Sequence, residues 1–371
     1  MKVGLFGTGA YGLALSSILI HNHCEVTMWT KFEKERDDLL KTRKNEALLP
    51  GFTLDKSVKI TCDVEECIKD KELLIIALPA AFVDSLCQEM EPFIDGNHIV
   101  IATKGIEQGT GLFMHEVLKK HLNTNSIAVI SGPSFAIDLV TKMPAGLSVA
   151  SKSPETILLT KKALQNNYIK LRDTNDITGV EICGSIKNVI ALAAGMLDGL
   201  KANDSTKAML IAEAMHDMEA ILDAFDCNKR TVLSFAGIGD LLLTCTSVKS
   251  RNFRLGKLIG EKPGREEVDA FLSTTTVEGY YTLESVYQLL KDKEVTIPII
   301  DLIYEIAVQG KDPELLLAFL VFKSKCSCIH GLVARKSDGL EQCRCYYPED
   351  IASCKADSKC SDDSYLGCVN K

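Results

Sequence analysis

A lysine within an apolar stretch is the residue of this chain best suited to do chemistry. Lys187 lies in residues 184–191 (GSIKNVIA), whose other members are mostly small or apolar. Burial disfavours the charged ammonium group and can bring the pKa of a lysine near neutrality, where the side chain can act as an acid or a base. The alternative is a lysine at the edge of a helix, with its charged end in water.

A glycine-rich turn near the N-terminus predicts a dinucleotide site. Gly7, Gly9 and Gly12 follow the pattern G-x-G-x-x-G. In this pattern the first glycine permits a tight turn, the second lets the backbone approach a pyrophosphate, and the third allows a helix to pack closely on a strand. The turn lies between an apolar strand and a predicted helix, which is the context that the pattern requires. NAD(P)H is therefore the expected cofactor, and a merely structural tight turn is the alternative.

The residues after the second predicted strand bear on the choice between NAD and NADP. An NAD-selective site usually places Asp or Glu there, to hold the ribose 2′-hydroxyl. This chain has Thr30 and Lys31 at that point, with Glu33 two residues beyond the lysine. Lys31 could pair with a 2′-phosphate, which favours NADP or mixed use, and the alternative is a solvated surface lysine.

Residues 1–180 are expected to form strands that alternate with helices. The expected strands are short and apolar: Val3–Phe6, Glu25–Trp29, Val58–Thr61, Leu73–Leu78, Ile99–Ala102 and Ile127–Ser131. Such alternation predicts a parallel sheet covered by helices on both faces, in which ligands bind outside the carboxyl ends of the strands. We thus expect an α/β domain of the Rossmann type over residues 1–180.

Beyond residue 180 the pattern changes to helices. The segments that suit helices are Thr178–Leu200, Ser205–Phe225, Glu266–Leu272, Tyr281–Lys291, Pro298–Val308 and Pro313–Phe322. We expect an all-α domain over residues 181–323, whose first long helix carries Lys187. Apolar periodicity ends near residue 323, so residues 324–371 are expected to be a tail or a small appended module.

Polar residues follow several of these elements. Lys104 follows one predicted strand, and Gly132 and Ser134 follow another. Asp240 lies between a glycine and an apolar run. Residues 250–252 (Ser-Arg-Asn) could surround a phosphate, because arginine offers a planar fork of donors. Each of these has a structural alternative, such as a helix cap or a solvated turn.

Composition and charge narrow the class of partner. The net charge is −8 and there is no long basic run, so nucleic acid is not an expected partner. Glycines interrupt the N-terminal apolar stretch, which therefore does not read as a signal peptide, and no uninterrupted apolar run approaches the length of a bilayer span. We expect a cytoplasmic protein without stable membrane insertion, and a homodimer is left open.

Half of the 14 cysteines crowd into the C-terminal tail. The other seven are scattered and are expected to be reduced residues of the core. In the tail, two C-x-C pairs, three further cysteines and His330 could bind zinc. A poorly packed extension is the alternative, since C-x-C is less specific for metal than C-x-x-C.

The order of motifs along residues 1–323 resembles that of the bacterial NAD(P)-dependent glycerol-3-phosphate dehydrogenases. The motifs are, in order, G-x-G-x-Y-G, A-T-K-G, S-G-P-S-F-A, K-N-V-I-A, G-x-G-D-L-x-x-T-C, S-R-N and V-E-G. Several short motifs in this order are far more specific than any one of them. The Cys-rich tail has no counterpart in that pattern.

The resemblance assigns roles residue by residue. Lys187 matches the proton donor and acceptor, Lys104 a substrate contact that also lies near the nicotinamide, and Asp240 their polar partner in the catalytic cluster. The further substrate contacts that it implies are Gly132, Ser134, Ser250, Arg251 and Asn252. The cofactor contacts that it implies are Gly7, Gly9, Ala10, Tyr11, Gly12, Lys31, Lys104, Ala136, Arg251, Val277 and Glu278. No metal is implied at this site.

The implied reaction is the reversible reduction of dihydroxyacetone phosphate to sn-glycerol 3-phosphate, which feeds glycerophospholipid synthesis. This chemistry needs a hydride at the carbonyl carbon and a proton at its oxygen. Lys187 could give that proton, with Lys104 lowering its pKa by like-charge repulsion and Asp240 holding it in place. Two alternatives are a related 3-hydroxy-acid dehydrogenase, in which a carboxylate replaces the phosphate, and a non-catalytic NAD(P)-sensing binding protein.

Overall fold

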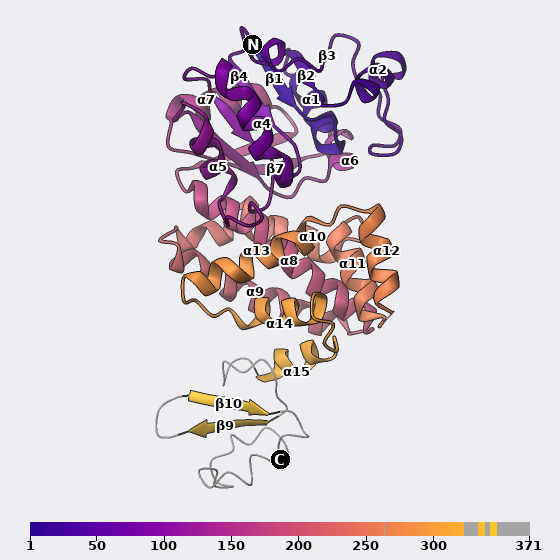
Figure 1. Ribbon diagram of the computed structural model, residues 1–371, viewed down its shortest axis with the longest axis vertical. Helices are drawn as coiled ribbons and strands as arrows, with labels where there is room; N and C mark the ends of the chain where they lie inside the picture. The colour runs from indigo at the N-terminus through magenta and orange to yellow at the C-terminus, as the bar shows by residue number, and fades with distance from the viewer. Residues whose placement is uncertain (263, 323–332, 338–341, 347–371) are drawn as a thin grey trace. The chain divides into compact units, whose positions relative to one another are not determined.

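The computed structural model describes residues 1–262, 264–322, 333–337 and 342–346, and of the last two segments only the backbone (Figure 1). The chain divides into two compact units. The first comprises Met1–Lys187 and Leu222–Leu243, and the second comprises Asn188–Ile221 and Thr244–Lys371. The expected boundary at residue 180 falls inside the long helix α8 (Ile177–Gly199), which contributes residues to both units.

The first unit contains an eight-stranded sheet in the order β3-β2-β1-β4-β5-β6-β7-β8. Its strands are β1 (Lys2–Phe6), β2 (Glu25–Trp29), β3 (Lys59–Thr61), β4 (Leu73–Ile76), β5 (Ile99–Ile101), β6 (Ile127–Ser131), β7 (Ala145–Ser151) and β8 (Ile169–Thr174). The expected parallel pairing holds from β3 to β6 and between β7 and β8, whereas β6 and β7 are antiparallel. The first six strands were expected from the sequence, and the last two were not.

Strand β7 is not predicted from an apolar run because small and polar residues interrupt its sequence. Ser148 and Ser151 are both 2% exposed. The Ser151 hydroxyl donates to the Ile127 carbonyl oxygen on β6 at 2.6 Å, which satisfies a polar group that would otherwise be costly to bury. Strand β8 is an edge strand that alternates between buried and exposed residues along its first half.

Helices cover both faces of this sheet, as its alternating sequence predicts (Figure 1). On one face α1 (Ala10–His21) packs against α6 (Ala136–Leu139) and α7 (Pro154–Leu164). On the other face α4 (Val83–Met90) packs against α3 (Val64–Ile68) and α5 (Met114–His121). The helix α2 (Glu33–Thr42) follows β2. Two short helices, η3 (Lys229–Leu233) and η4 (Phe235–Gly239), also belong to this unit.

The second unit is helical in the part of it that contains described side chains. It contains the C-terminal half of α8, most of α9 (Asp204–Ala224) and the end of α10 (Asp240–Thr246). The helices that lie wholly within it are α11 (Arg251–Gly260), α12 (Arg265–Thr274), α13 (Glu278–Asp292), α14 (Pro298–Ala307) and α15 (Leu315–Phe322). Glycines let α8 and α11 approach closely, since a Cβ on Gly256 would lie 2.0 Å from the Leu192 carbonyl oxygen.

Helix α8 is long and apolar enough to cross a membrane by length and composition, and it is the one described helix that meets this test. Its apolar window is wholly buried in the protein, as in the core helix of a soluble protein. The same helix therefore forms much of the interior and also carries the lysine that the sequence singled out.

The expected tail contains one described pair of antiparallel strands, β9 (Val333–Ser337) and β10 (Gln342–Tyr346). The remainder of the tail, with His330 and most of its cysteines, lies outside the described residues. The zinc hypothesis for this segment therefore stays a prediction. Of the seven earlier cysteines, five are buried and two, Cys62 and Cys227, are partly buried.

Candidate active site

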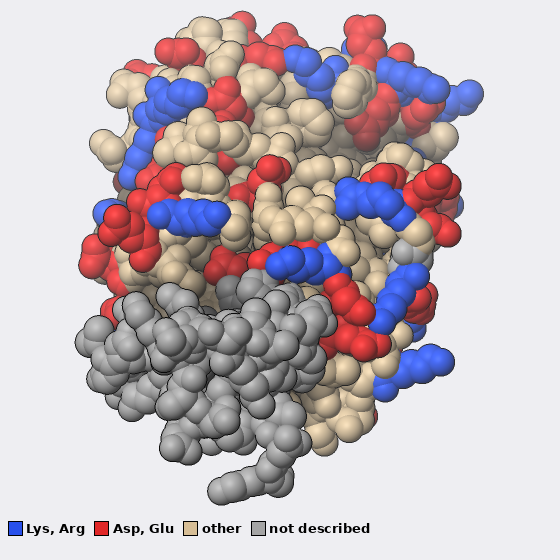
Figure 2. Space-filling model, turned by 60° about the horizontal axis from the view of Figure 1, so that its bottom comes forward, with Lys and Arg blue, Asp and Glu red and all other residues tan. Residues whose placement is uncertain are grey.

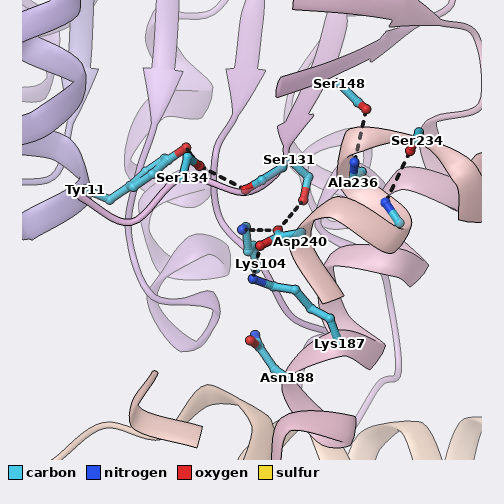
Figure 3. A network of polar contacts seen from close by, with 12 residues as sticks. Tyr11, Lys104, Ser131, Ser134, Ser148, Lys187, Asn188, Ser234, Ala236 and Asp240 are labelled. Atoms are coloured by element: carbon cyan, nitrogen blue, oxygen red, sulfur yellow. Dashed lines mark hydrogen bonds and ion pairs between the residues drawn. The ribbon is translucent and has the colours of Figure 1, made fainter. Parts of the chain in front are cut away.

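Two lysines share one buried carboxylate in the first unit (Figure 3). The Lys187 Nζ donates to the Asp240 Oδ1 at 2.6 Å, and the Lys104 Nζ donates to the Asp240 Oδ2 at 2.6 Å. The Lys187 side chain is 6% exposed, that of Lys104 is 17% exposed and that of Asp240 is 1% exposed. This burial excludes the alternative of a lysine that reaches solvent at a helix edge.

The two lysines that share this carboxylate differ in basicity: Lys104 is a strong base and Lys187 a weak one. Burial lowers the pKa of Lys187, and the Lys104 charge lowers it further against the opposing effect of Asp240, so that this pKa falls to about 8. Burial also acts to lower the pKa of Lys104, but the Asp240 charge outweighs it and raises that pKa above its usual value. Burial acts to raise the pKa of Asp240, and the two lysine charges outweigh it, so the carboxyl stays ionised. Lys187 is therefore the group of this cluster that can exchange a proton near neutral pH.

Strand ends position the first half of the cluster. Lys104 follows β5, next to Thr103, whose hydroxyl donates to the Leu78 carbonyl oxygen after β4 at 2.8 Å. Ser131 ends β6 and donates to the Asp240 Oδ2 at 3.5 Å. Helix α8 comes close to both, since a Cβ on Gly184 would lie 3.0 Å from the Ser131 Oγ. The lack of a side chain at residue 184 thus lets Lys187 reach the carboxylate.

The two unexpected strands position Asp240. The turn η4 precedes the aspartate and is bonded to β7, since the Ala236 N–H donates to the Ser148 Oγ at 3.2 Å (Figure 3). The Phe235 ring packs over Gly146 of β7, where a Cβ would come within 2.7 Å of the ring. The Arg172 guanidinium of β8 lies 5.0 Å from the centre of the same ring. These contacts hold the start of α10, and hence the aspartate, against the sheet.

The glycine turn of the same unit fits a dinucleotide. Gly7 has a φ of +121°, and a Cβ there would lie 2.5 Å from the Ala77 carbonyl oxygen. A Cβ on Gly12 would lie 2.1 Å from the Gly7 carbonyl oxygen, whereas one on Gly9 would meet nothing within 4 Å. The helix α1 has no side-chain cap. Open space therefore adjoins the N–H groups of the helix N-terminus, which is the arrangement that binds a pyrophosphate.

A second polar set lies beside this turn. The Tyr11 hydroxyl of α1 lies 3.0 Å from the Ser134 Oγ, and the Ser134 hydroxyl donates to the Gly132 carbonyl oxygen at 3.0 Å (Figure 3). Burial raises the pKa of Tyr11, which therefore remains a neutral donor. Ala136 begins α6 directly after this segment. The structure thus brings together Tyr11, Gly132 and Ser134 in one hydrogen-bonded set.

Five further predicted residues belong to the second unit. Ser250 caps α11, its Oγ accepting from the Phe253 N–H at 3.2 Å, and Arg251 is exposed at the start of that helix. Asn252 is buried and holds Asn188, since its Nδ2 donates to the Asn188 Oδ1 at 3.0 Å. Val277, which is buried, and Glu278, which is partly exposed, lie at the start of α13.

Three residues of these networks were not singled out from the sequence. Ser131 and Asn188 lie inside the S-G-P-S-F-A and K-N-V-I-A motifs, in which only neighbouring residues were assigned roles. Glu181 of α8 accepts from the His115 N–H at 2.9 Å and from its ring Nδ1 at 2.5 Å, which ties α8 to α5. No local signal predicts that last contact, because the partners lie 66 residues apart.

The predicted cofactor contact Lys31 already has a partner. Its Nζ donates to the Glu89 Oε1 of α4. Next to it the Thr30 hydroxyl donates to the Glu35 Oε2 at 2.5 Å. The sequence suggested that this corner lacks an acid, whereas the fold brings two carboxylates to it.

Comparison with known proteins identifies the family. Residues 2–157 match the model of the NAD-dependent glycerol-3-phosphate dehydrogenase N-terminus, and residues 176–318 match that of the corresponding C-terminus. The glycerol-3-phosphate dehydrogenase [NAD(P)+] of Thermoanaerobacter sp. (strain X514) is 33% identical over 333 residues, which cover 90% of this chain and all of that protein. The enzyme of the same name from Clostridium botulinum (strain Eklund 17B / Type B) is 33% identical over 87% of this chain and 98% of its own length.

A solved structure agrees with these matches. The crystal structure of glycerol-3-phosphate dehydrogenase from Coxiella burnetii has a TM-score of 0.81 and is 28% identical, and the match covers 86% of this chain and 98% of that one. The two matched family segments span both the sheet unit with its glycine turn and the helical unit. The chain therefore belongs to the family of NAD-dependent glycerol-3-phosphate dehydrogenases.

Proposed function

We propose that this chain interconverts dihydroxyacetone phosphate and sn-glycerol 3-phosphate with NAD(P)H as cofactor. The observation that carries the proposal is the buried Lys187, with its pKa of about 8, in a chain that belongs to this family. The open space at Gly9 supports the cofactor. A role in glycerophospholipid synthesis fits the family.

In the reduction, Lys187 acts as the general acid. The bound nicotinamide would supply a hydride, with its electron pair, to the carbonyl carbon of the substrate. The Lys187 Nζ gives its proton to the carbonyl oxygen, which becomes the hydroxyl of sn-glycerol 3-phosphate. In the oxidation, neutral Lys187 removes that proton again. Proton and hydride together account for the two hydrogens gained by the substrate.

Asp240 and Lys104 prepare Lys187 for this role. The carboxylate holds the Lys187 Nζ in one position, at 2.6 Å, and partly offsets the cost of its burial. Lys104 stays protonated, so we propose that it contacts the substrate as a fixed positive charge near the developing alkoxide. Gly132 and Ser134 are proposed as further substrate contacts, and Tyr11 and Ala136 as cofactor contacts.

The phosphate of the substrate is assigned to the start of α11. Ser250, Arg251 and Asn252 form the first turn of this helix with its cap, where backbone N–H groups and an arginine favour an anion. Because the Asn252 amide is bonded to Asn188 and to the Gly279 N–H, we propose that it mainly positions this region. Val277 and Glu278 are proposed as cofactor contacts, as is Arg251.

A substrate panel tests the proposed activity. Oxidation of NADH and of NADPH is followed with dihydroxyacetone phosphate, with unphosphorylated dihydroxyacetone and with a 3-oxo acid. Rapid turnover is expected for the phosphorylated ketone alone. Turnover of the 3-oxo acid would instead support the related hydroxy-acid dehydrogenase, and binding of NADH without any turnover would support a sensor.

The rate is expected to depend on pH with opposite signs in the two directions. Reduction needs protonated Lys187, so its kcat/KM falls as the pH rises through about 8. Oxidation needs neutral Lys187, so its kcat/KM falls as the pH decreases through the same value. Initial rates in both directions between pH 6 and 10 measure this. Profiles with the same sign in both directions would contradict the role of Lys187.

Removal of Arg251 is expected to weaken the phosphorylated substrate selectively. Arg251→Ala raises the KM for dihydroxyacetone phosphate by the equivalent of about 1.5–3 kcal/mol, the size of a lost hydrogen bond to a charged group. The poor reduction of unphosphorylated dihydroxyacetone should hardly change. Arg254→Ala, three residues further along the same helix, is the control. Equal losses on both substrates, measured at saturating cofactor, would contradict the phosphate contact and leave Arg251 only a cofactor contact or a role in the fold.

A chain truncated after Lys323 is expected to fold and to retain most of its activity. The family match ends at residue 318, and every candidate site residue precedes that point. Specific activity and the thermal midpoint, compared with those of the full chain, measure this. Zinc content of both forms tests the hypothesis for the tail cysteines. Loss of activity on truncation would show that residues 324–371 support the catalytic body.

The partner is a small-molecule substrate. Lys and Arg side chains are interspersed with Asp and Glu among the described residues of the face shown in Figure 2, as suits a protein without a polyanionic partner. The burial of the apolar window of α8 supports a protein without membrane insertion.

We propose a cytoplasmic location. Light scattering of the purified protein tests the homodimer that the sequence leaves open.

A further inference from the structure

The ion pair between Lys31 and Glu89 lies where the protein must distinguish NADH from NADPH. Strands β1 and β2 pair with Phe6 beside Trp29, and the Gly7 N–H donates to the Trp29 carbonyl oxygen at 3.0 Å. The residues after Trp29 therefore adjoin the glycine turn. In dinucleotide-binding folds this strand end faces the adenosine ribose, whose 2′-hydroxyl in NADH is replaced by a 2′-phosphate in NADPH.

Two basic residues at this corner, Lys31 and Arg36, are bonded to carboxylates. Lys31 donates to Glu89, which lies in α4 and is 58 residues away along the chain. Arg36 donates through its Nε to the Asp37 Oδ1 at 2.9 Å. A 2′-phosphate that binds Lys31 has to displace the Glu89 carboxylate from it, whereas a 2′-hydroxyl requires no such exchange.

The Lys31–Glu89 pair is accessible enough for this exchange. The Lys31 side chain is 57% exposed and that of Glu89 is 37% exposed. Pairs with such exposure contribute little to folding, because water screens them and the side chains lose freedom on pairing. Replacing Glu89 should therefore leave the fold intact and change mainly what a ligand meets at Lys31.

We propose that Glu89 is a specificity-determining residue of this enzyme. By pairing with Lys31 it withholds that cation from the 2′-phosphate of NADPH and disfavours NADPH relative to NADH. The 2′-hydroxyl of NADH is neutral, so the Lys31–Glu89 pair does not change the affinity for NADH. The inference rests on the NAD(P)H use of the proposed function and adds the residue that sets the ratio between the two cofactors.

Glu89→Gln tests the proposal, with Glu91→Gln as the matched control. Glu91 is exposed and lies just beyond the end of α4, so its replacement changes the net charge equally. Calorimetry measures the binding of 2′,5′-ADP, which carries the 2′-phosphate, and of 5′-AMP, which does not. Glu89→Gln is expected to tighten 2′,5′-ADP roughly two- to fivefold, the scale of an exposed charge interaction, and to leave 5′-AMP unchanged. The ratio of kcat/KM for NADPH over NADH should rise by a similar factor.

The double variant Lys31→Gln/Glu89→Gln shows whether Glu89 acts through Lys31. Without the lysine the gain for 2′,5′-ADP should disappear. An equal gain in Glu91→Gln, a gain shared by 5′-AMP, or a gain that persists without Lys31 would each overturn the proposal. Failure of the wild type to bind either NADH or NADPH would contradict the proposed function itself, whereas cofactor binding without the 2′-phosphate effect would contradict only this inference.

Discussion

Replacing Lys187 by methionine is expected to lower kcat by roughly two to four orders of magnitude, the usual contribution of a positioned acid or base. Methionine keeps much of the length of the side chain and cannot exchange a proton. The Asp240 carboxylate keeps its bond to Lys104, at 2.6 Å, so the fold should survive. Steady-state kinetics in both directions, with NADH binding measured by fluorescence, separates the chemical step from cofactor affinity.

Lys187→Arg is the control for charge. Arginine keeps a cation next to Asp240 but does not release its proton at accessible pH, so it should be nearly as slow as methionine. Cofactor affinity should change little in either variant. A methionine variant with kcat near that of the wild type would remove Lys187 from the mechanism.

Replacing Asp240 by asparagine is expected to destabilise the fold by about 3–5 kcal/mol, the scale observed when one partner of a buried ion pair is removed. Both Lys187 and Lys104 donate to this carboxylate, which is 1% exposed. The negative charge of Asp240 acts to raise the pKa of both lysines, whereas burial acts to lower it. The variant should therefore hold Lys187 neutral at pH 7 and reduce the ketone slowly. Urea unfolding followed by circular dichroism measures the loss.

The sign of the pH dependence distinguishes this effect from simple misfolding. Without the carboxylate the folded state disfavours the ammonium form, whereas the unfolded lysines keep a pKa of about 10.4. The stability deficit of Asp240→Asn should therefore narrow as the pH rises from 7 toward 10. A deficit that is constant over this range would mean that the lysine charges are not its cause.

Asp198→Asn is the matched control, because Asp198 also pairs with two lysines. Its carboxylate lies 2.6 Å from the Lys207 Nζ and 3.0 Å from the Lys257 Nζ. It is 23% exposed, and water screens such pairs, so its replacement should cost about 1 kcal/mol or less. A similar loss in both variants would show that the burial of Asp240 is not decisive.

Local patterns in the sequence determined much of the fold and the family. The glycine turn could be predicted because its three glycines fall within six residues in a known pattern. In the structure Gly7 has a positive φ, and a Cβ on Gly12 would clash with the Gly7 carbonyl oxygen. Helix α8 could be predicted because its apolar run is long. Lys187 stood out because a charged residue within such a run needs a partner. The order of the motifs then indicated the family, which the comparisons confirm.

Packing between segments that are distant in the sequence decided the geometry of the site and the last two strands of the sheet. The acid of the site reaches Lys104 across 136 residues and Lys187 across 53, and only tertiary structure sets such distances. Strands β7 and β8 hold Asp240 in place and were both missed. The serines and the glycine of β7 are buried by hydrogen bonding and close packing rather than by apolar character, and charged residues alternate with the apolar ones along the edge strand β8. Likewise, the sequence placed Lys31 at a ribose corner without an acid, and folding brought Glu89 to it from another helix. The charge that a ligand meets depends on which side chains the fold brings together, and nearest neighbours in the chain do not encode that.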